Sequence, residues 1–206
     1  MSTPSSFDAQ ALAIWEAQIE NPGSDLWMWA RPKVKVSLLV AEFLKSKGIR
    51  HVFGISGGAS LHLIHGIVDT GLELICPQHE QACGFAADAY ARIAGLGCAV
   101  ATSGPGATNL ITAIAASYYD SVPVLYITGQ VTTFRMGNGK VRQAGFQETP
   151  IVQMCWPITK YAKTVMKAED VIPTLEEAVM IAKSGRRGPV LVDLPDDIQR
   201  AEHWRG

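Results

Sequence analysis

The chain has 206 residues, of which 48% are hydrophobic and 18% charged, and its formal net charge is −1. This size and composition allow one substantial core, while the 18 Lys and Arg are spread along the chain, which argues against nucleic acid as a partner. No apolar run approaches the roughly 20 residues needed to cross a bilayer. The N-terminal residues also lack the basic-then-apolar pattern of a signal peptide, so we expect a cytoplasmic protein without membrane contact.

Strand-like and helix-like segments alternate along the chain. Apolar residues at i, i+3, i+4, i+7 and i+8 from Val36 to Leu44, followed by Gly48, predict a first helix. Apolar runs predict strands near residues 51–55, 73–76, 98–102, 124–128, 161–165 and 190–194. Helical spacing predicts helices near residues 60–69, 79–94, 108–118 and 169–183. Because most strands are continuous apolar runs, we predict a three-layer α/β domain, with a largely parallel six-stranded sheet and helices on both faces.

The predicted domain spans residues 34–200, between an extension at 1–33 and a short C-terminal tail at 201–206. Three of the five tryptophans lie in the extension, where Leu12, Trp15 and Ile19 form one helical stripe. Such a stripe has to be buried, so it either folds back on the domain or docks on a partner. We expect docking on a partner, because aromatic anchors are effective at interfaces.

Glu80 lies where an apolar strand ends and a helix of small residues begins. In open parallel sheets, ligands bind at this edge, because loops and helix N-termini converge there. A carboxylate in this position can therefore bind or catalyse. The alternative is that Glu80 only interacts favourably with the helix dipole in the first turn.

Six ordered segments resemble a known family. They are residues 52–60 (VFGISGGAS), 79–81 (HEQ), 101–109 (ATSGPGATN), 120–123 with 127–130 (DSVP, ITGQ), 146–150 (FQETP) and 185–193 (GRRGPVLVD). Together they resemble the N-terminal pyrimidine-binding domain of thiamine diphosphate enzymes, closest to the large subunit of acetolactate synthase. The resemblance covers residues from about 36 to 199, nearly the whole chain.

The resemblance implies that Glu80 is catalytic. In that family, a carboxyl group at this position exchanges a proton with ring nitrogen 1′ of thiamine diphosphate, which lets the cofactor's own amino group deprotonate carbon 2. The activated cofactor decarboxylates a 2-keto acid and transfers the acyl-anion equivalent to an acceptor. The donor acid, the acceptor, a choice between decarboxylase and carboligase, and the presence of flavin stay open.

The glycine loop after the first predicted strand is implied to bind the cofactor through Gly57, Gly58 and Ala59. Glycines at 57 and 58 would let backbone approach the thiazolium side closely. A nucleotide-binding Rossmann domain is the alternative, but neither G-x-G-x-x-G nor a P-loop Lys-Ser/Thr is present. Related synthases usually have proline before the paired glycines, whereas this chain has Ser56.

The segment from Ser103 to Asn109 is a second strand-to-helix turn. The resemblance places it against the aminopyrimidine ring, which implies cofactor-binding positions for Pro105 and Asn109. A plain tight turn is the alternative for the segment, and a helix-start role is the alternative for Asn109.

The glycine-containing segment 130–150 is predicted to be a mobile loop. The resemblance implies that Phe146 and Gln147 reach the substrate pocket of the partner subunit, with Gln147 acting in catalysis. The alternative is that Phe146 only anchors the loop. Related synthases commonly carry a lysine after the last strand, where this chain has Asp196 and Asp197. This departure favours a specialised decarboxylation or carboligation over true acetolactate production.

The resemblance implies that the chain contains half of a cofactor site. No Gly-Asp-Gly occurs in it, and in the resembled family that motif, with a later Asn, holds Mg²⁺ and the diphosphate through oxygen ligands. We therefore expect a separate subunit with a diphosphate-binding domain, in an assembly of two chains of each kind. The alternatives are a fragment of a longer synthase and a non-catalytic domain that regulates or scaffolds a full-length relative.

The cysteine and histidine residues do not form a recognisable metal site in the sequence. The four cysteines are expected as reduced core thiols, and the spacing of Cys76, His79 and Cys83 lacks a fourth zinc ligand. We expect no metal bound by this chain. His62 and His65 are interpreted as surface or packing residues without an acidic partner.

Overall fold

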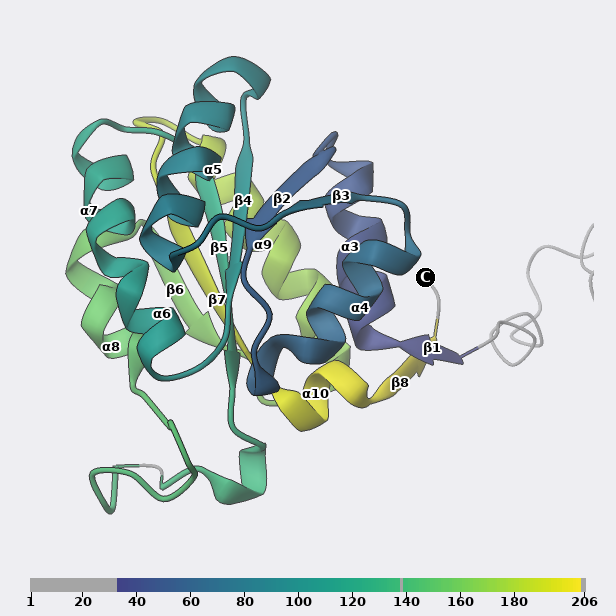
Figure 1. Ribbon diagram of the computed structural model, residues 1–206. Helices are drawn as coiled ribbons and strands as arrows, with labels where there is room; N and C mark the ends of the chain where they lie inside the picture. Colours follow the sequence, from purple (N-terminus) through teal and green to yellow (C-terminus); the bar gives the residue numbers. More distant parts are fainter. Residues whose placement is uncertain (1–32, 138, 205–206) are drawn as a thin grey trace, which may run out of the picture.

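The computed structural model describes residues 33–137 and 139–204 and contains a six-stranded parallel sheet with the order β3-β2-β4-β5-β7-β6 (Figure 1). The strands of this sheet are β2 (His51–Gly54), β3 (Glu73–Ile75), β4 (Gly97–Ala101), β5 (Val124–Gln130), β6 (Tyr161–Thr164) and β7 (Val190–Pro195). The register of the central pair places Ala101 beside Thr128, and the next pair places Thr128 beside Asp193. The carboxyl ends of β4, β5 and β7 therefore lie side by side.

Helices cover both faces of the sheet. One face carries α3 (Val36–Ser46), α4 (Leu61–Asp69), α9 (Val171–Lys183) and α10 (Asp196–Arg200). The other carries α5 (Glu80–Ala94), α6 (Pro105–Asn109), α7 (Ile111–Tyr119) and α8 (Ile151–Cys155). The described residues also include four short 3-10 turns, η1 (Gly58–Ser60), η2 (Thr133–Arg135), η3 (Trp156–Ile158) and η4 (Ala168–Asp170).

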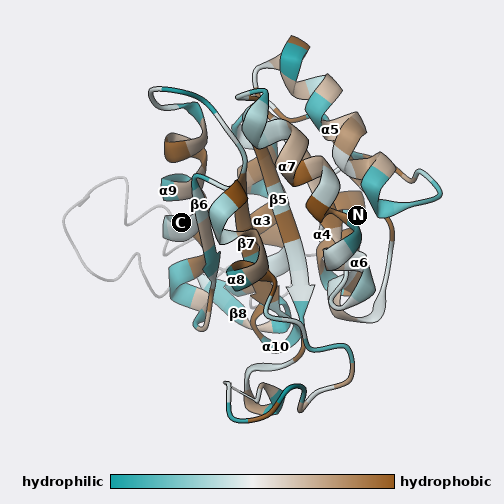
Figure 2. Ribbon diagram, turned by 90° about the vertical axis from the view of Figure 1, so that its left-hand side faces the viewer, coloured by the Kyte–Doolittle hydropathy of each residue, from teal (hydrophilic) through white to brown (hydrophobic). Residues whose placement is uncertain are grey.

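Two cores form because successive strand residues point to opposite faces. In β4, Cys98 and Val100 belong to the core under α3 and α9, while Ala99 and Ala101 belong to the core under α5 and α7. All five residues of β4 are buried. Figure 2 shows the same pattern as hydrophobic strands enclosed between helices whose outer sides are more hydrophilic. The predicted three-layer fold is confirmed, and the described sheet is parallel throughout.

A second, two-stranded sheet flanks the domain. Strand β1 (Lys33–Lys35) pairs antiparallel with β8 (Glu202–Trp204), so that Lys33 lies opposite Trp204. Sequence patterns did not predict these strands, because their sequences, KVK and EHW, contain no apolar run. The pairing joins residues from the predicted extension and tail to the ends of the domain, and residues 1–32 lie outside the described part. The domain boundaries themselves stay a prediction.

Candidate active site

The candidate site lies at the carboxyl edge of the parallel sheet, the lower edge in Figure 1. The turn at η1 follows β2, helix α6 follows β4, and the long loop 131–150 follows β5. Helix α5, which begins at Glu80, packs against β2, β4 and α6. The chain therefore brings most of the predicted site residues to one edge, as expected for parallel α/β sheets.

Glu80 is the first residue of α5 and is half-buried. The residue before it, His79, caps the helix by accepting a hydrogen bond from the Gln81 backbone N–H at 3.1 Å. The Glu80 carboxylate is therefore not needed as the cap. Its Oε2 instead accepts a hydrogen bond of 2.9 Å from Nδ2 of Asn109, which fixes the carboxylate toward α6.

Asn109 is the last residue of α6, so the alternative that it only starts a helix is wrong. Its amide reaches across 29 positions of sequence to Glu80. Pro105 stands at the start of the same short helix and is exposed. The two predicted residues therefore differ in role: Asn109 contacts the acid directly, and Pro105 shapes the turn.

Small residues keep the space beside Glu80 open. A Cβ on Gly106 would lie 3.4 Å from Glu80 Oε1 and 2.7 Å from Cγ2 of Thr102. A Cβ on Gly57 would lie 2.5 Å from Thr102 Cβ. Thr102 thus packs between the two glycine turns, and any side chain at Gly57 or Gly106 would force them apart.

Ala59 is held from both sides of its peptide. Its N–H donates to Thr102 Oγ1 at 3.2 Å, and its carbonyl accepts from Nε2 of Gln199 at 2.7 Å. Gly58, in contrast, is exposed and has nothing within 4 Å of an added Cβ. The fold therefore requires glycine at position 57 but not at position 58.

Gln147 lies against the turn before α6. Its backbone has φ of +62°, unusual for a residue with a side chain, and its Cβ is 2.7 Å from the position of a Cβ added to Gly104. Gly104 itself has φ of +62°. The close approach and the positive φ both explain glycine at 104.

Phe146, next to Gln147, is 86% exposed. An anchoring side chain would be buried, so the structure argues against the interpretation that Phe146 only anchors the loop. Its aromatic ring is available at the carboxyl edge of the sheet.

The side chain of Glu148 holds together the loop that carries Phe146 and Gln147. Glu148 accepts backbone hydrogen bonds from Gly137, Ala144 and Gly145 at 2.7, 2.7 and 3.2 Å. Burial acts to raise the pKa of Glu148, but these three bonds outweigh it and lower the pKa. The loop predicted to be mobile is therefore internally hydrogen-bonded.

One end of this loop is tied to α10 and the other to the end of β5. Asp197 accepts from Thr133 N and Oγ1 at 2.9 and 2.6 Å, and Gln130 Nε2 donates to the Thr149 carbonyl at 2.8 Å. Gln130 also donates to Asp193 Oδ2 at 3.2 Å.

Asp193 is a buried acid at the carboxyl end of β7. Thr128 donates to its Oδ1 at 2.7 Å and Thr164 to its Oδ2 at 3.0 Å. Burial raises the pKa of Asp193 to about 7, although these hydrogen bonds and that of Gln130 act to lower it. Asp193 and Gln130 also line a cavity of about 360 Å³ under the loop.

Sequence reasoning assigned no role to Thr102, Gln130, Asp193 or Gln199. A weak signal was available for Thr102, Gln130 and Asp193, because each lies close to the carboxyl end of a predicted strand, whereas Gln199 lies further along the chain and had no such signal. Asp196, which stands where related synthases carry a lysine, lies 3.7 Å from His62 and 3.1 Å from Arg200.

Two expectations about histidine and cysteine were wrong. His62 and His65 both have acidic partners, Asp196 and Asp69, the latter at 3.1 Å. Cys76 is exposed rather than a core thiol. Cys83, Cys98 and Cys155 are buried, as expected. Within residues 33–137 and 139–204, no group of three His, Cys, Asp or Glu side chains is placed to hold a metal.

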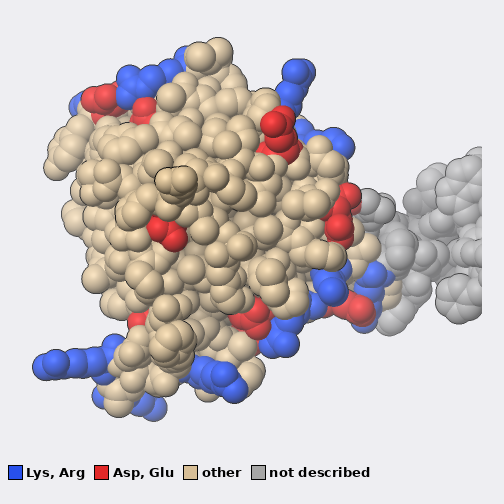
Figure 3. Space-filling model, viewed as in Figure 1, with Lys and Arg blue, Asp and Glu red and all other residues tan. Residues whose placement is uncertain are grey.

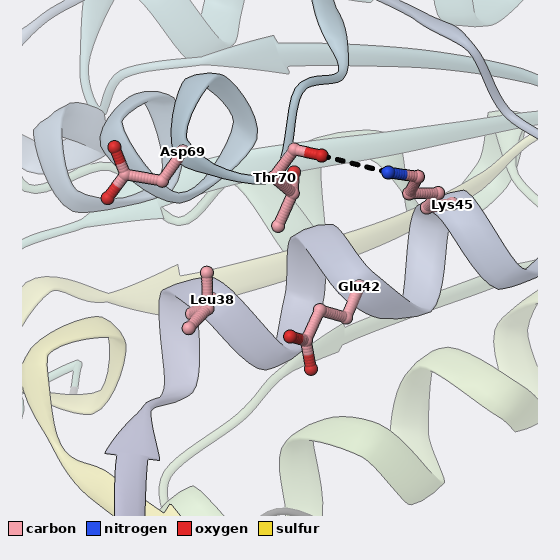
Figure 4. Close-up of a pocket in the computed structure, with 5 residues that line it drawn as sticks. All are labelled: Leu38, Glu42, Lys45, Asp69 and Thr70. Carbon is pink, nitrogen blue, oxygen red and sulfur yellow. Dashed lines mark hydrogen bonds between the residues drawn. The ribbon is translucent and has the colours of Figure 1, made fainter. Parts of the chain in front are cut away.

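A further cavity, of about 430 Å³, lies between α3 and α4, away from the candidate site. Figure 4 shows Glu42, Lys45 and Asp69 around it, with Lys45 Nζ donating to the Thr70 carbonyl at 3.0 Å. Its charges are of both signs and its basic residue already bonds to backbone, so we assign no ligand to it.

Comparison with known proteins defines the class of this fold and site. The family model of the thiamine pyrophosphate enzyme N-terminal TPP binding domain matches residues 34–154. The chain belongs to this family, and the resemblance inferred from the six segments is confirmed.

Curated relatives are acetolactate synthases. The chloroplastic acetolactate synthase of Arabidopsis thaliana is 44% identical over 172 residues, which are 82% of this chain and 25% of that protein. A probable acetolactate synthase large subunit of Methanocaldococcus jannaschii is 43% identical over 79% of this chain and 27% of that protein. The large subunit of Haemophilus influenzae is also 43% identical, over 80% of this chain and 28% of its own length. The chain thus spans about a quarter of the length of these relatives.

No helix among the described residues is long and apolar enough to cross a membrane. The cytoplasmic location stays a prediction from the sequence.

Proposed function

We propose that this chain supplies the pyrimidine-binding half of a thiamine diphosphate site, in an acetolactate synthase-like enzyme that decarboxylates a 2-keto acid and transfers the acyl-anion equivalent to an acceptor. The observation that carries the proposal is the carboxylate of Glu80, fixed at the carboxyl edge of the sheet by Asn109. Membership in the family supports the cofactor.

The residues around Glu80 fit an aminopyrimidine ring. Asn109 occupies Oε2, and no described residue donates a hydrogen bond to Oε1. A Cβ at position 106 would lie 3.4 Å from Oε1, and glycine at this position leaves that space free. A flat heteroaromatic ring can therefore bring a ring nitrogen to Oε1.

When bound, thiamine diphosphate supplies the electron sink for decarboxylation. Glu80 holds and moves the proton at the ring nitrogen, and Asn109 keeps the carboxylate in one orientation for that transfer. Gly57, Gly58 and Ala59 are proposed to border the cofactor at the turn after β2, with Ala59 fixed by Thr102 and Gln199.

Phe146 and Gln147 are proposed to border the substrate. The exposed ring of Phe146 and the constrained backbone of Gln147 lie on a loop whose two ends are tied down. Such a loop can hold both side chains in place for a substrate that binds across a subunit interface. Pro105 is proposed to support the pyrimidine side through the turn before α6.

The other half of the site has to come from elsewhere. Mg²⁺ prefers carboxylate and amide oxygens, and this chain lacks the Gly-Asp-Gly motif that supplies them in the family. We propose that a diphosphate-binding domain provides these ligands, on a separate subunit in an assembly of two chains of each kind. Since the relatives are about three times as long as this chain, the same domain could instead follow on a longer protein of which this sequence is a part.

Calorimetry tests the half-site. The 206-residue chain alone should show no Mg²⁺-dependent affinity for thiamine diphosphate, because an aminopyrimidine contact lacks the diphosphate anchor. Adding a chain from the same organism that carries Gly-Asp-Gly and a later Asn should restore Mg²⁺-dependent binding. Tight Mg²⁺-dependent binding by the isolated chain would overturn the shared site.

The same mixture tests the alternative of a non-catalytic regulatory domain. An assembly that binds the cofactor and releases CO₂ from pyruvate supports the enzyme. An assembly whose CO₂ release is unchanged by replacing Glu80 supports regulation or scaffolding instead.

A further inference from the structure

A separate group of side chains lies at the opposite edge of the sheet, where β6 and β7 begin. Two tyrosines and three cations line a cavity of about 410 Å³ there, namely Tyr118, Tyr119, Lys160, Arg186 and Arg187. They come from the end of α7, the residue before β6 and the loop between α9 and β7. Among the residues that the structure describes, no carboxylate lines this cavity.

Figure 3 shows Lys and Arg atoms gathered at the upper left of the molecule, with acidic atoms beside them. The acid that follows Tyr119 in sequence, Asp120, is already paired with Arg92 at 2.6 Å. It therefore does not neutralise the cations of the cavity.

The existing bonds of two cations leave their charges uncompensated. Arg186 donates from Nε to Ser121 Oγ at 2.7 Å and from Nη2 to the Tyr119 carbonyl at 3.4 Å. Lys160 donates to the Ser184 carbonyl at 2.6 Å and to that of Ile181. All these acceptors are neutral, and a guanidinium with five N–H donors keeps several free.

Arg187 is exposed and has no hydrogen bond or ion pair with any described residue. Its whole guanidinium is available to a ligand. The cavity therefore has one uncommitted cation and one partly committed cation side by side in sequence.

Helix dipoles oppose an anion here but do not cancel the cations. Helices α7 and α9 end near this edge, at Tyr119 and Lys183. Each helix end carries roughly half a negative charge, so the two bring about one. Three cations exceed this by about two charges. Burial lowers the pKa of Lys160, and a bound anion would stabilise its charged form.

The tyrosines add a planar, apolar component. Tyr118 is 37% exposed and Tyr119 70% exposed, and their rings meet edge to face with centroids 5.7 Å apart. Arg guanidinium groups bind phosphate through paired N–H groups, and exposed aromatic faces stack on planar rings. The cavity volume also falls in the range of roughly 300–1,000 Å³ found for small-molecule sites.

We propose that this cavity binds a small phosphorylated aromatic ligand of the nucleoside monophosphate class. Arg186 and Arg187 contact the phosphate, Lys160 adds positive potential, and Tyr119 stacks on the ring. The site lies at the amino edge of the sheet and includes no residue of the candidate active site. It therefore does not rest on the proposed function, and it requires neither Mg²⁺ nor a second subunit.

The test uses the 206-residue chain, titrated calorimetrically with AMP, adenosine and inorganic phosphate in Mg²⁺-free buffer. AMP should bind saturably at one site, and adenosine and phosphate each at least about tenfold more weakly, since each lacks one half of the contacts. Hydrogen bonds to charged groups contribute about 1.5–3 kcal/mol, so Arg187→Gln should weaken the binding of AMP by about tenfold or more. Tyr119→Leu should weaken the binding of AMP but leave the binding of phosphate unchanged.

Lys163→Gln is the matched control, because Lys163 is an exposed cation on β6 that does not line the cavity. It should bind AMP like the wild type. An equal loss in Lys163→Gln and Arg187→Gln would mean that net charge alone attracts AMP, which overturns the site. Absence of saturable AMP binding, or phosphate affinity equal to that of AMP, would overturn it as well. Circular dichroism confirms that each variant is folded.

Discussion

The side chains of Glu80 and Asn109 meet at 2.9 Å, although 29 positions of sequence separate them. Glu80 begins α5 and Asn109 ends α6, so the contact joins two helices that follow β3 and β4, strands that are separated by β2 in the sheet. A helix-start acid that only faced the dipole would need no such partner. The contact leaves Oε1 as the oxygen that faces the space kept open by Gly106.

Replacing Glu80 by Gln should abolish cofactor activation in the assembled enzyme while leaving folding and assembly intact. The amide cannot carry the proton to the ring nitrogen, and general acid–base catalysis contributes roughly a hundred- to ten-thousand-fold. Hydrogen–deuterium exchange at carbon 2 of the cofactor, read by NMR after acid quench, isolates this step from substrate binding. Glu169→Gln is a matched control, since Glu169 is an exposed acid at another helix start. Equal exchange rates in Glu80→Gln and wild type would show that Glu80 has only a structural role.

Gly57 and Gly58 should respond differently to alanine. Gly57→Ala should lower the free energy of unfolding of the isolated chain, because its Cβ would collide with Thr102. Gly58→Ala should leave that free energy unchanged, because nothing lies within 4 Å of the new Cβ. If Gly58 borders the cofactor as proposed, the same substitution should weaken thiamine diphosphate binding in the assembled enzyme.

Urea unfolding of the isolated chain and calorimetry of the assembly measure the two effects. Unchanged cofactor affinity in Gly58→Ala would show that Gly58 does not border the cofactor. Unchanged stability in Gly57→Ala would show that the turn after β2 can move away from Thr102.

Asp193 should make the chain less stable as pH rises from about 4 to 7. Burial raises its pKa from 3.8 to about 7, so in this window the folded chain keeps a proton that the unfolded chain has lost. The free energy of unfolding should therefore fall by up to about 1.4 kcal/mol per pH unit from this group, and the loss should level off above its folded pKa.

Urea unfolding at several pH values between 4.5 and 7.5 measures this slope. Asp193→Asn should flatten it, because the amide does not titrate, whereas Asp170→Asn at an exposed acid should not. If the free energy of unfolding depends on pH equally in wild type and Asp193→Asn, Asp193 ionises in the folded state near its ordinary pKa.

Gln199→Leu should destabilise the turn after β2. The buried amide of Gln199 donates to the carbonyls of Ala59 and Leu194, each at 2.7 Å. Leucine fits a buried position but leaves both carbonyls without this donor, at a cost of about 1–3 kcal/mol for each buried group left unpaired. Loss of the Gln199 oxygen, which has no hydrogen-bond partner among the described residues, offsets part of this cost.

Thermal unfolding compared with Gln153→Leu, at an exposed glutamine, measures the difference. Equal melting temperatures for the two variants would show that Ala59 needs no support from α10.

The sequence alone determined the strands, the main helices and the position of Glu80. These features are local, because a run of apolar residues defines a buried strand and a 3.6-residue period defines a helix face. Ordered motifs also identified the family. The strands β1 and β8 were missed because KVK and EHW contain no apolar run, unlike the equally short β3, and their pairing joins the two ends of the domain.

Only the tertiary structure decided which side chains meet. Strand order places β4 between β2 and β5, and this puts Thr102 against Gly57 and Ala59. Gln199 reaches Ala59 across 140 positions because α10 follows β7 back along the same edge. A local pattern records which face of an element is apolar, but it does not record which distant element packs there. Long-range packing therefore set the contacts of Glu80, the support of the glycine turn and the burial that raises the pKa of Asp193.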